Sequence, residues 1–315
     1  MNPDSAPAVF QSPSSEGVEL REVSRGSDVP LVLAIGLMWL QLFYSVTPVW
    51  IYGQYYTYAW VVPPIASFFF YRRWKRRPRI EQQTSGEIAT IAAAIILFPA
   101  LLLIRALEGF DPSWRLPILS HAGIIALVSH WLVWRRCGRS TSLGMIPVTI
   151  FALSAIPYPS RLEHSLIQVL TEWVVQAAGI LFELMGRTVI VSGGMLEHRG
   201  IKVEVTDGCS GIQSLQSLVM VALCFGEFFR LRTPQRFLLV ALAGAVALLV
   251  NVGRAIFLAR IRFDQSESAF NAAHDGVGHV AFAIGGLCLL IITRILIGRD
   301  GKKRKTLRRT QVKST

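Results

Sequence analysis

The sequence has little charge for its length. Only 17% of its 315 residues are charged, whereas 52% are hydrophobic, and the mean hydropathy is +0.45. A soluble domain of this size carries more polar surface than this composition supplies. The composition therefore excludes an ordinary soluble globular protein and predicts an all-α integral membrane protein with several spans.

Cysteine is also scarce, and the sequence contains no Cys-x-x-Cys pair. Of the four cysteines, Cys224 and Cys288 lie in the middle of apolar runs, which argues against a disulfide framework or a zinc site. We therefore expect no metal and no other cofactor. Internal repeats, a phosphate-cradling glycine loop and nucleic-acid motifs are missing too, so we expect no nucleic-acid partner.

A cleavable signal peptide is not evident at the start of the sequence. Residues 1–28 are polar and rich in Ser, Pro and Glu, which predicts a disordered cytoplasmic tail.

The charge that is present is mostly positive, with a net charge of +12 and a pI of about 10.1. Lys and Arg cluster at the ends of apolar runs, which is the pattern that orients membrane proteins. The densest cluster, residues 72–79, is the strongest cytoplasmic marker. The basic tail after Ile297 is expected to contact anionic membrane lipid.

Eight apolar runs are long enough to be spans, since a span needs about 20 mostly apolar residues. They are Val29 to Thr47, Tyr56 to Tyr71, Ile88 to Ala106, Leu116 to Trp134, Leu143 to Tyr158, Gly208 to Phe229, Phe237 to Phe257 and His274 to Ile297. The basic clusters then place both termini in the cytoplasm, which predicts a multi-pass protein of the cytoplasmic (inner) membrane.

The predicted organisation has four regions. Residues 1–28 form the cytoplasmic tail, 29–158 hold spans one to five, 159–297 hold spans six to eight with the elements outside the membrane, and 298–315 form a basic cytoplasmic tail.

The segment 163–186 is patterned differently from the other long runs. Polar residues recur in it at steps of three and four, which predicts an amphipathic helix with one polar stripe. We interpret it as a helix at the membrane surface, and a ninth span with its stripe facing inward is the alternative. Residues 188–191 and 200–205 have strand character, and Ser192-Gly193-Gly194 joins them into a predicted extracytoplasmic hairpin.

The run Thr206-Asp207-Gly208-Cys209-Ser210-Gly211 lies where this strand-like segment meets the sixth span. A cysteine in the first turn of a membrane helix is favoured as a thiolate by unpaired backbone N–H groups and by the helix dipole. The glycines flanking Cys209 would let a substrate backbone approach closely. By itself the signal is weak, because a lone membrane cysteine is more often a small packing residue.

Two further motifs fall at the same outer level of the predicted topology. Arg254 follows Asn251 by one turn near the outer end of the seventh span, and His274 begins the eighth span. Charged residues in or near the bilayer are expensive and are commonly functional. Asp275 is placed to orient His274 or Arg254, and solvation in an outer loop is its other interpretation.

The three residue types have a common chemical logic. A cysteine thiolate attacks an amide carbonyl, and a histidine exchanges a proton with the thiol and the leaving amine. A fixed arginine stabilises the negative oxygen of the tetrahedral intermediate. Together Cys209, His274 and Arg254 indicate acyl transfer through a thioester.

These motifs resemble the exosortase/archaeosortase family of membrane transpeptidases. The matching residues are Cys209-Ser210-Gly211 with Ser214-Leu215, Asn251-x-x-Arg254, and His274-x-x-x-Gly278. The resemblance covers roughly residues 157–296, and the first four spans match mainly in hydropathy. One departure is Gln213, where many relatives carry a basic residue, and it leaves the substrate subtype open.

The resemblance implies a Cys209 nucleophile assisted by Arg254 and His274, with the active site on the extracytoplasmic side. Its implied substrates are exported proteins whose C-terminal sorting signal comprises a short motif, one transmembrane helix and a basic cluster. The enzyme would cut near the motif and pass the new carboxyl end to a cell-surface acceptor.

Two alternatives remain at the level of sequence. Gly208-Cys209-Ser210-Gly211 also resembles the Gly-x-Ser-Gly of rhomboid intramembrane proteases, in which case Ser210 would be the nucleophile, but this pattern does not explain Arg254. The other alternative is a non-enzymatic transporter or assembly protein whose polar span ends line a substrate path.

Overall fold

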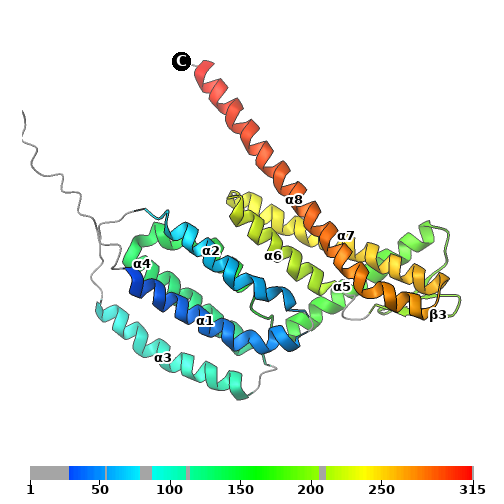
Figure 1. The fold of residues 1–315 in the computed structure, drawn as a ribbon, viewed down its shortest axis with the longest axis horizontal. Coiled ribbons are helices and arrows are strands. Elements are labelled where there is room, and N and C mark those ends of the chain that lie inside the picture. The colour runs from blue at the N-terminus through cyan, green and yellow to red at the C-terminus, as the bar shows by residue number, and fades with distance from the viewer. Residues whose placement is uncertain (1–27, 54, 79–86, 111–113, 206–210, 314–315) are drawn as a thin grey trace, which may run out of the picture.

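The computed structural model is almost entirely helical, and it describes residues 28–53, 55–78, 87–110, 114–205 and 211–313 (Figure 1). The predicted disordered tail 1–28 lies outside these residues except for Asp28. The elements in chain order are α1 Val29–Tyr52, η2 Thr57–Val61, α2 Val62–Trp74, α3 Glu87–Phe110, α4 Leu116–Leu153, α5 Ser160–Leu184, β1 Ile190–Ser192, β2 Met195–His198, β3 Ile201–Glu204, α6 Ile212–Phe228, α7 Thr233–Asp264 and α8 Glu267–Lys313.

Proline marks where several of these helices begin. α1, α2, α4 and α7 each carry a proline at the first or second helical position. Proline fits there because the first N–H groups of a helix have no intrahelical partner to lose. The sequence thus fixes these helix starts locally.

α4 is two helices that fold back on each other at Gly138. This glycine has φ 82° and ψ 164°, which interrupts the helix. His130 contacts Ser142 and Thr149 through its two ring nitrogens, at 3.2 and 2.9 Å to the hydroxyl oxygens. These contacts require antiparallel halves, since in one straight helix residues 130 and 149 would lie far apart. The halves correspond to the predicted fourth and fifth spans.

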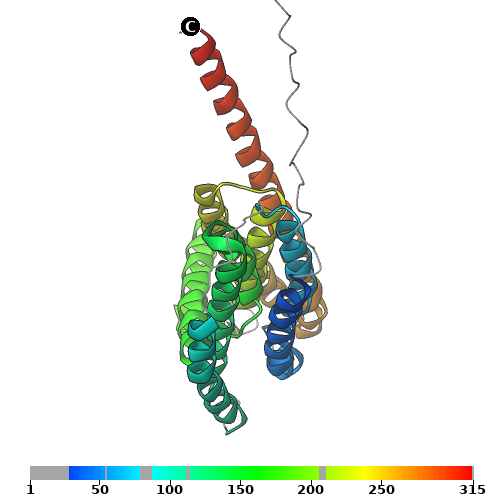
Figure 2. The same ribbon diagram turned by 90° about the vertical axis from the view of Figure 1, so that its left-hand side faces the viewer.

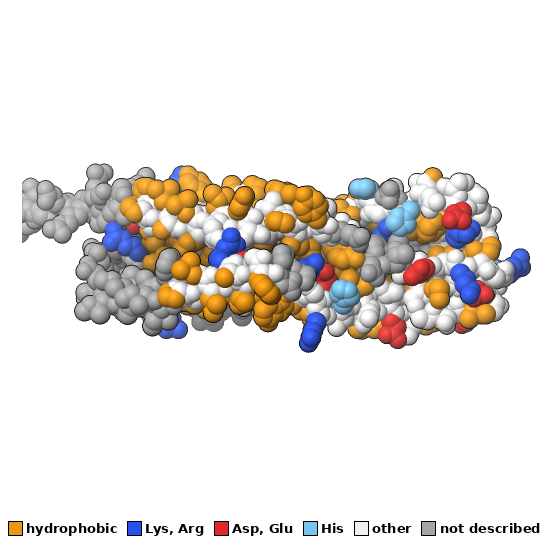
Figure 3. Space-filling model, turned by 90° about the horizontal axis from the view of Figure 1, so that it is seen from below, with side chains coloured by type: hydrophobic (Ala, Val, Ile, Leu, Met, Phe, Trp, Pro, Cys, Tyr) orange, Lys and Arg blue, Asp and Glu red, His pale blue; other side chains and the backbone are white. Residues whose placement is uncertain are grey.

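Five segments among the described residues are long and apolar enough to cross a membrane. They are α1, α4, α5, α7 and Gly276–Gly298 of α8. Large apolar side chains are exposed on them, such as Leu33, Leu37 and Leu40 of α1, as expected of a lipid-facing surface. Figure 3 shows this apolar cover over the α1–α4 half, with most of the visible Asp, Glu and His side chains toward the end that carries the sheet.

The number of spans stays a prediction, and α5 is the reason. By length and composition α5 qualifies as a span. In Figure 1 it crosses behind α7 at an angle. The surface helix and the ninth span therefore both stay predictions.

The predicted two-stranded hairpin is a three-stranded antiparallel sheet. β2 lies between β1 and β3, with Leu196 opposite both Val191 and Val203. The prediction was incomplete because it assigned no strand to residues 195–198, which form β2. One face of the sheet packs on α5, where the Cβ of a side chain at Gly179 would lie only 2.5 Å from Cγ2 of Val191. The sheet, α5 and α7 share one apolar core.

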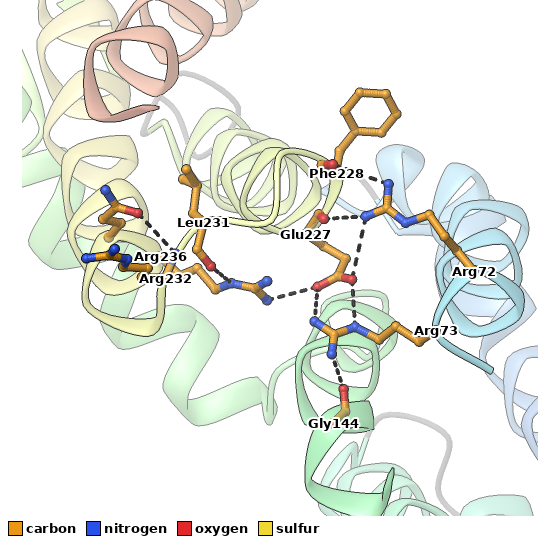
Figure 4. A network of polar contacts seen from close by, with 9 residues as sticks. Arg72, Arg73, Gly144, Glu227, Phe228, Leu231, Arg232 and Arg236 are labelled. Atoms are coloured by element: carbon orange, nitrogen blue, oxygen red, sulfur yellow. Dashed lines mark hydrogen bonds and ion pairs between the residues drawn. The ribbon is translucent and has the colours of Figure 1, made fainter. Parts of the chain in front are cut away.

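A buried carboxylate ties the helices together at one end of the bundle, which we call the inner end. Glu227, near the end of α6, is 2% exposed. Arg73 donates two hydrogen bonds to its carboxylate oxygens, both at 2.7 Å, and Arg236 donates a third at 2.9 Å. Arg72 donates to the main-chain oxygens of Glu227 and Phe228, so α2, α6 and α7 meet here (Figure 4).

A second buried carboxylate lies at the opposite end, which we call the outer end. Glu163 in the first turn of α5 accepts hydrogen bonds from the Tyr56 hydroxyl and from Nη1 of Arg115, the latter at 2.7 Å to both oxygens. The Tyr56 hydroxyl in turn accepts from the backbone N–H of Tyr158 at 2.9 Å. This network holds the start of α5 to the start of α4 and the segment before η2.

α8 continues well past the bundle. Its helix runs through the predicted basic tail to Lys313 and projects away from the other helices, as Figure 2 shows from the side. The last predicted span and the tail are therefore one continuous helix.

Candidate functional site

α6 begins at Ile212, not at Gly208 as predicted, because Gly211 precedes it in a left-handed conformation. Gly211 has φ +89°, a region that favours glycine, and it caps the helix. The predicted position of Cys209 at the start of this span is not tested, because the described chain resumes at Gly211. Residues 206–210, with Cys209 and Ser210, lie outside the described part of the chain.

Asn251 of α7 packs directly on Gly211. A Cβ built on the glycine would lie 2.7 Å from Nδ2 and 2.8 Å from Cγ of Asn251, so no side chain fits there. Asn251 is only 3% exposed. The first two sequence motifs are therefore in contact, and chain connectivity alone keeps Cys209, two residues before Gly211, within about 7 Å of that glycine.

Arg254 lies one helical turn after Asn251 and reaches α8. Its guanidinium lies against Gly278, where a Cβ would be 3.6 Å from Nη2 and 3.7 Å from Cζ. The Arg254 side chain is half-buried between the two helices. Position 278 is therefore in direct contact range of the arginine, so a long side chain there would compete with the guanidinium for space.

His274 is one turn before Gly278 on α8, and residues four apart share a helix face. Its ring is half-buried and packs on Phe270 with 5.9 Å between centroids. His274 therefore lies one turn along α8 from the glycine that Arg254 of α7 contacts. The side chain of Asp275 lies outside the described part of the structure.

The structure thus brings the Asn251-x-x-Arg254 and His274-x-x-x-Gly278 motifs together with Gly211, the last residue of the cysteine motif. Gly211, just before α6, contacts Asn251 of α7, and Arg254, one turn further along α7, contacts Gly278 of α8, with His274 one turn away on α8. A half-buried cation that contacts the helix carrying a histidine supplies two of the components of acyl-transfer chemistry.

Sequence reasoning missed Gln216. This α6 residue is 3% exposed, and among the described residues neither its amide nitrogen nor its amide oxygen has a hydrogen-bond partner. A glutamine in an apolar run was the available signal.

Gln213, which the sequence singled out, is exposed, and its Nε2 donates to the hydroxyl of Thr57 at 3.1 Å. This bond ties the start of α6 to η2.

Within the described ranges, no group of three His, Cys, Asp or Glu side chains is arranged to hold a metal ion. The described cysteines, Cys137, Cys224 and Cys288, are free thiols.

Comparison with known proteins gives one match. A family model described as transmembrane exosortase matches residues 50–291, which is most of the chain and includes all three motifs. No curated protein and no solved structure matches.

Proposed function

Because the chain belongs to the transmembrane exosortase family, we propose that it is a membrane cysteine protease or transpeptidase acting through a thioester. The observation that supports this most is the pair of contacts, Gly211 with Asn251 and Arg254 with Gly278. These two contacts join the segment before α6 to α7 and α7 to α8 at one end of the bundle, which supports a shared site for a single substrate bond.

The proposed reaction has two halves. The Cys209 thiolate attacks the carbonyl carbon of the scissile peptide bond, and the electron pair moves onto oxygen, beside the Arg254 guanidinium. When the C–N bond breaks, His274 delivers to the leaving amine the proton that it took from the Cys209 thiol, and a thioester remains. Water or an acceptor nucleophile then gives a proton to His274 and attacks the thioester, which releases the Cys209 thiolate and completes hydrolysis or transfer.

The proposed substrates are exported proteins with a C-terminal signal made of a short motif, one membrane helix and a basic cluster. Such a helix, lying beside the bundle, would place the motif at the level of Arg254 and His274 and the basic cluster at the other membrane surface. The positive clusters at the inner end support a cytoplasmic inner end and an extracytoplasmic site. The enzyme would act in the cytoplasmic membrane.

The test is to follow processing of a tagged exported protein with a C-terminal sorting helix in cells expressing variants. Cys209→Ala and Cys209→Ser are expected to abolish processing, whereas Ser210→Ala retains it. Loss with Ser210→Ala alone would instead indicate a serine protease. Full processing by all three variants would leave a transporter or assembly protein as the better interpretation.

Two substitutions separate the effect of the planar Arg254 guanidinium from the effect of its charge. Arg254→Lys keeps a cation but loses the planar fork of donors, so we expect processing to fall by about tenfold or more, and Arg254→Gln to be weaker still. Equal activity of the lysine variant and wild type would argue against a directional role in stabilising the intermediate.

A further inference from the structure

A hollow of about 320 Å³ lies at the inner end of the bundle, at the opposite end of α6 from Gly211. It is bounded by the end of α2, the second half of α4 and the end of α6. Among the described residues that line it, Glu227 is the one carboxylate. The five arginines of the lining are Arg72, Arg73, Arg76, Arg77 and Arg230.

Three of these arginines are already engaged by the protein. Arg73 makes the two-pronged contact with Glu227, and Arg72 donates to carbonyl oxygens at the end of α6 (Figure 4). Arg77 forms an ion pair with Asp28. These contacts neutralise the single carboxylate and cover the negative end of the α6 dipole, which would otherwise repel an anion.

Two arginines are left over. Arg76 and Arg230 are exposed, and within the described part of the chain neither guanidinium has a hydrogen-bond or ion-pair partner. They follow the ends of α2 and α6, which are far apart in the sequence, and both line this hollow. Two guanidinium groups at one opening create a strong positive potential.

A buried hydroxyl in the lining points independently to a ligand. Thr141 is 4% exposed, and its Oγ1 has no hydrogen-bond partner among the described residues. The same is true of the buried Nε of Arg72. Buried polar atoms are almost always paired in folded proteins, because leaving one unpaired is unfavourable.

We propose that this hollow binds a phosphate group, carried by an anionic phospholipid headgroup or by a free phosphate ester, between Arg76, Arg230 and Thr141. Arginine forks match phosphate oxygens in pairs, and the threonine hydroxyl donates to a third oxygen. The site is separate from the candidate active site and does not depend on the proposed reaction.

The experiment measures binding to the purified full-length protein in a neutral detergent by the rise in unfolding temperature. The added probes are short-chain phosphatidylglycerol, short-chain phosphatidylcholine and inorganic phosphate. The test variants are Arg76→Gln/Arg230→Gln, which changes only exposed side chains, and Thr141→Val, which removes the hydroxyl at nearly constant shape. The matched control, Arg161→Gln/Arg260→Gln, removes two exposed arginines elsewhere.

Phosphatidylglycerol is expected to stabilise the wild type and the control variant equally. The Arg76/Arg230 variant should bind it at least about tenfold more weakly, because one hydrogen bond to a charged group is worth about that factor. Thr141→Val should lose affinity several-fold. Stabilisation by phosphatidylglycerol but not by inorganic phosphate identifies a lipid site, and the reverse identifies a free phosphate ester.

Two results would overturn the proposal. One is unchanged binding of both anionic probes by the Arg76/Arg230 variant. The other is an equal loss in the control variant, which would mean that surface charge alone attracts the anions.

Discussion

Two glycines set how closely the helices approach at the candidate site. Gly211 lies against Asn251, where a Cβ would overlap the amide, and Gly278 lies against Arg254, where a Cβ would make an ordinary contact with the guanidinium. The sequence motifs contain both glycines, but only the structure tells which neighbour each one contacts. Their effects differ, because Gly211 is constrained by backbone conformation and space together, whereas only a side chain that extends beyond Cβ at position 278 would reach into the space of Arg254.

Gly211→Ala is expected to lower stability and to reduce processing strongly. Its left-handed backbone costs about 1–2 kcal/mol for a residue with a Cβ, and the new methyl group would overlap Asn251. Gly253→Ala is the control, since a Cβ there meets no atom within 4 Å and alanine is the better helix former. Thermal unfolding in detergent and the processing assay measure the two effects. Equal behaviour of the two variants would contradict the account of Gly211.

Gly278→Leu is expected to displace the Arg254 guanidinium and reduce processing by about tenfold or more. Gly276→Leu, two residues earlier on α8, should leave processing close to wild type, because a Cβ there meets nothing within 4 Å. A processing rate for the Gly278 variant equal to that of the Gly276 variant would show that Arg254 does not depend on this contact.

An ion pair outside the predicted spans gives a pH dependence. Arg187, after α5, donates two hydrogen bonds to Asp264 at the end of α7, at 2.8 and 2.9 Å. The hydrogen bond from Arg187 holds the pKa of Asp264 below its usual value. The pair therefore contributes its full stability above the ordinary aspartate pKa of about 4, and this contribution is lost as the pH falls through the lower folded pKa.

The expected outcome is a difference in unfolding temperature between wild type and Asp264→Asn that is constant from pH 7 to 5 and shrinks toward pH 3. Arg187→Gln should show the same trend, because it removes the other partner. A difference that does not change with pH would argue against the ion pair as its source.

At the scale of elements, the buried Glu227 joins α2, α6 and α7. Breaking a buried pair is costly, because the remaining charges lose their partner, and three arginines share this one carboxylate. Those arginines are partly exposed, which reduces the penalty.

Glu227→Gln should therefore destabilise the protein by roughly 2–4 kcal/mol. Glu267→Gln is the control, because its pair with Arg262 lies at the surface and is worth about 0.5 kcal/mol. Chemical or thermal unfolding in detergent measures both. A loss no larger than that of the control would mean that the arginines find other partners.

The sequence predicted most helices but placed some boundaries wrongly. The basic cluster around Arg136 correctly divided α4 into two halves, since charge and Gly138 act at the same place. The start of α6 was misplaced, because apolar character cannot report that Gly211 has a left-handed backbone. β2 was missed, because its four residues are too few to show an alternating pattern.

The molecule as a whole has two ends of different chemistry. The inner end gathers arginines around one carboxylate, and the outer end carries the sheet, α5 and the candidate site. The sequence predicted this grouping from the order of spans and charges. It could not predict the contacts of Gly211 and Gly278 with α7, which depend on helix rotation, nor the burial of Gln216.

Orientation in the membrane is testable by thiol labelling. In a background with all four cysteines replaced by alanine, Lys202→Cys in the sheet should react with a membrane-impermeant maleimide in right-side-out vesicles. Arg76→Cys should react only in inverted vesicles. Labelling of both from the same side would contradict the orientation.

The same background tests the placement of α5. Gln176→Cys, at an exposed position near the middle of α5, should be labelled in right-side-out vesicles if the helix lies on the surface. Protection from labelling on both sides would show instead that α5 is a span.

The attachment of α6 at Glu227 has a mechanical consequence. Gly211 and Glu227 are 16 residues apart, which is about 24 Å along a helix, so a small tilt of α6 about the Glu227 carboxylate displaces the end of the helix at the candidate site. A tilt of about 5° would move Gly211 by roughly 2 Å, enough to separate a nucleophile from its target. Weakening the contacts between the arginines and Glu227 should therefore lower the processing rate at the opposite end of the bundle before it unfolds the protein.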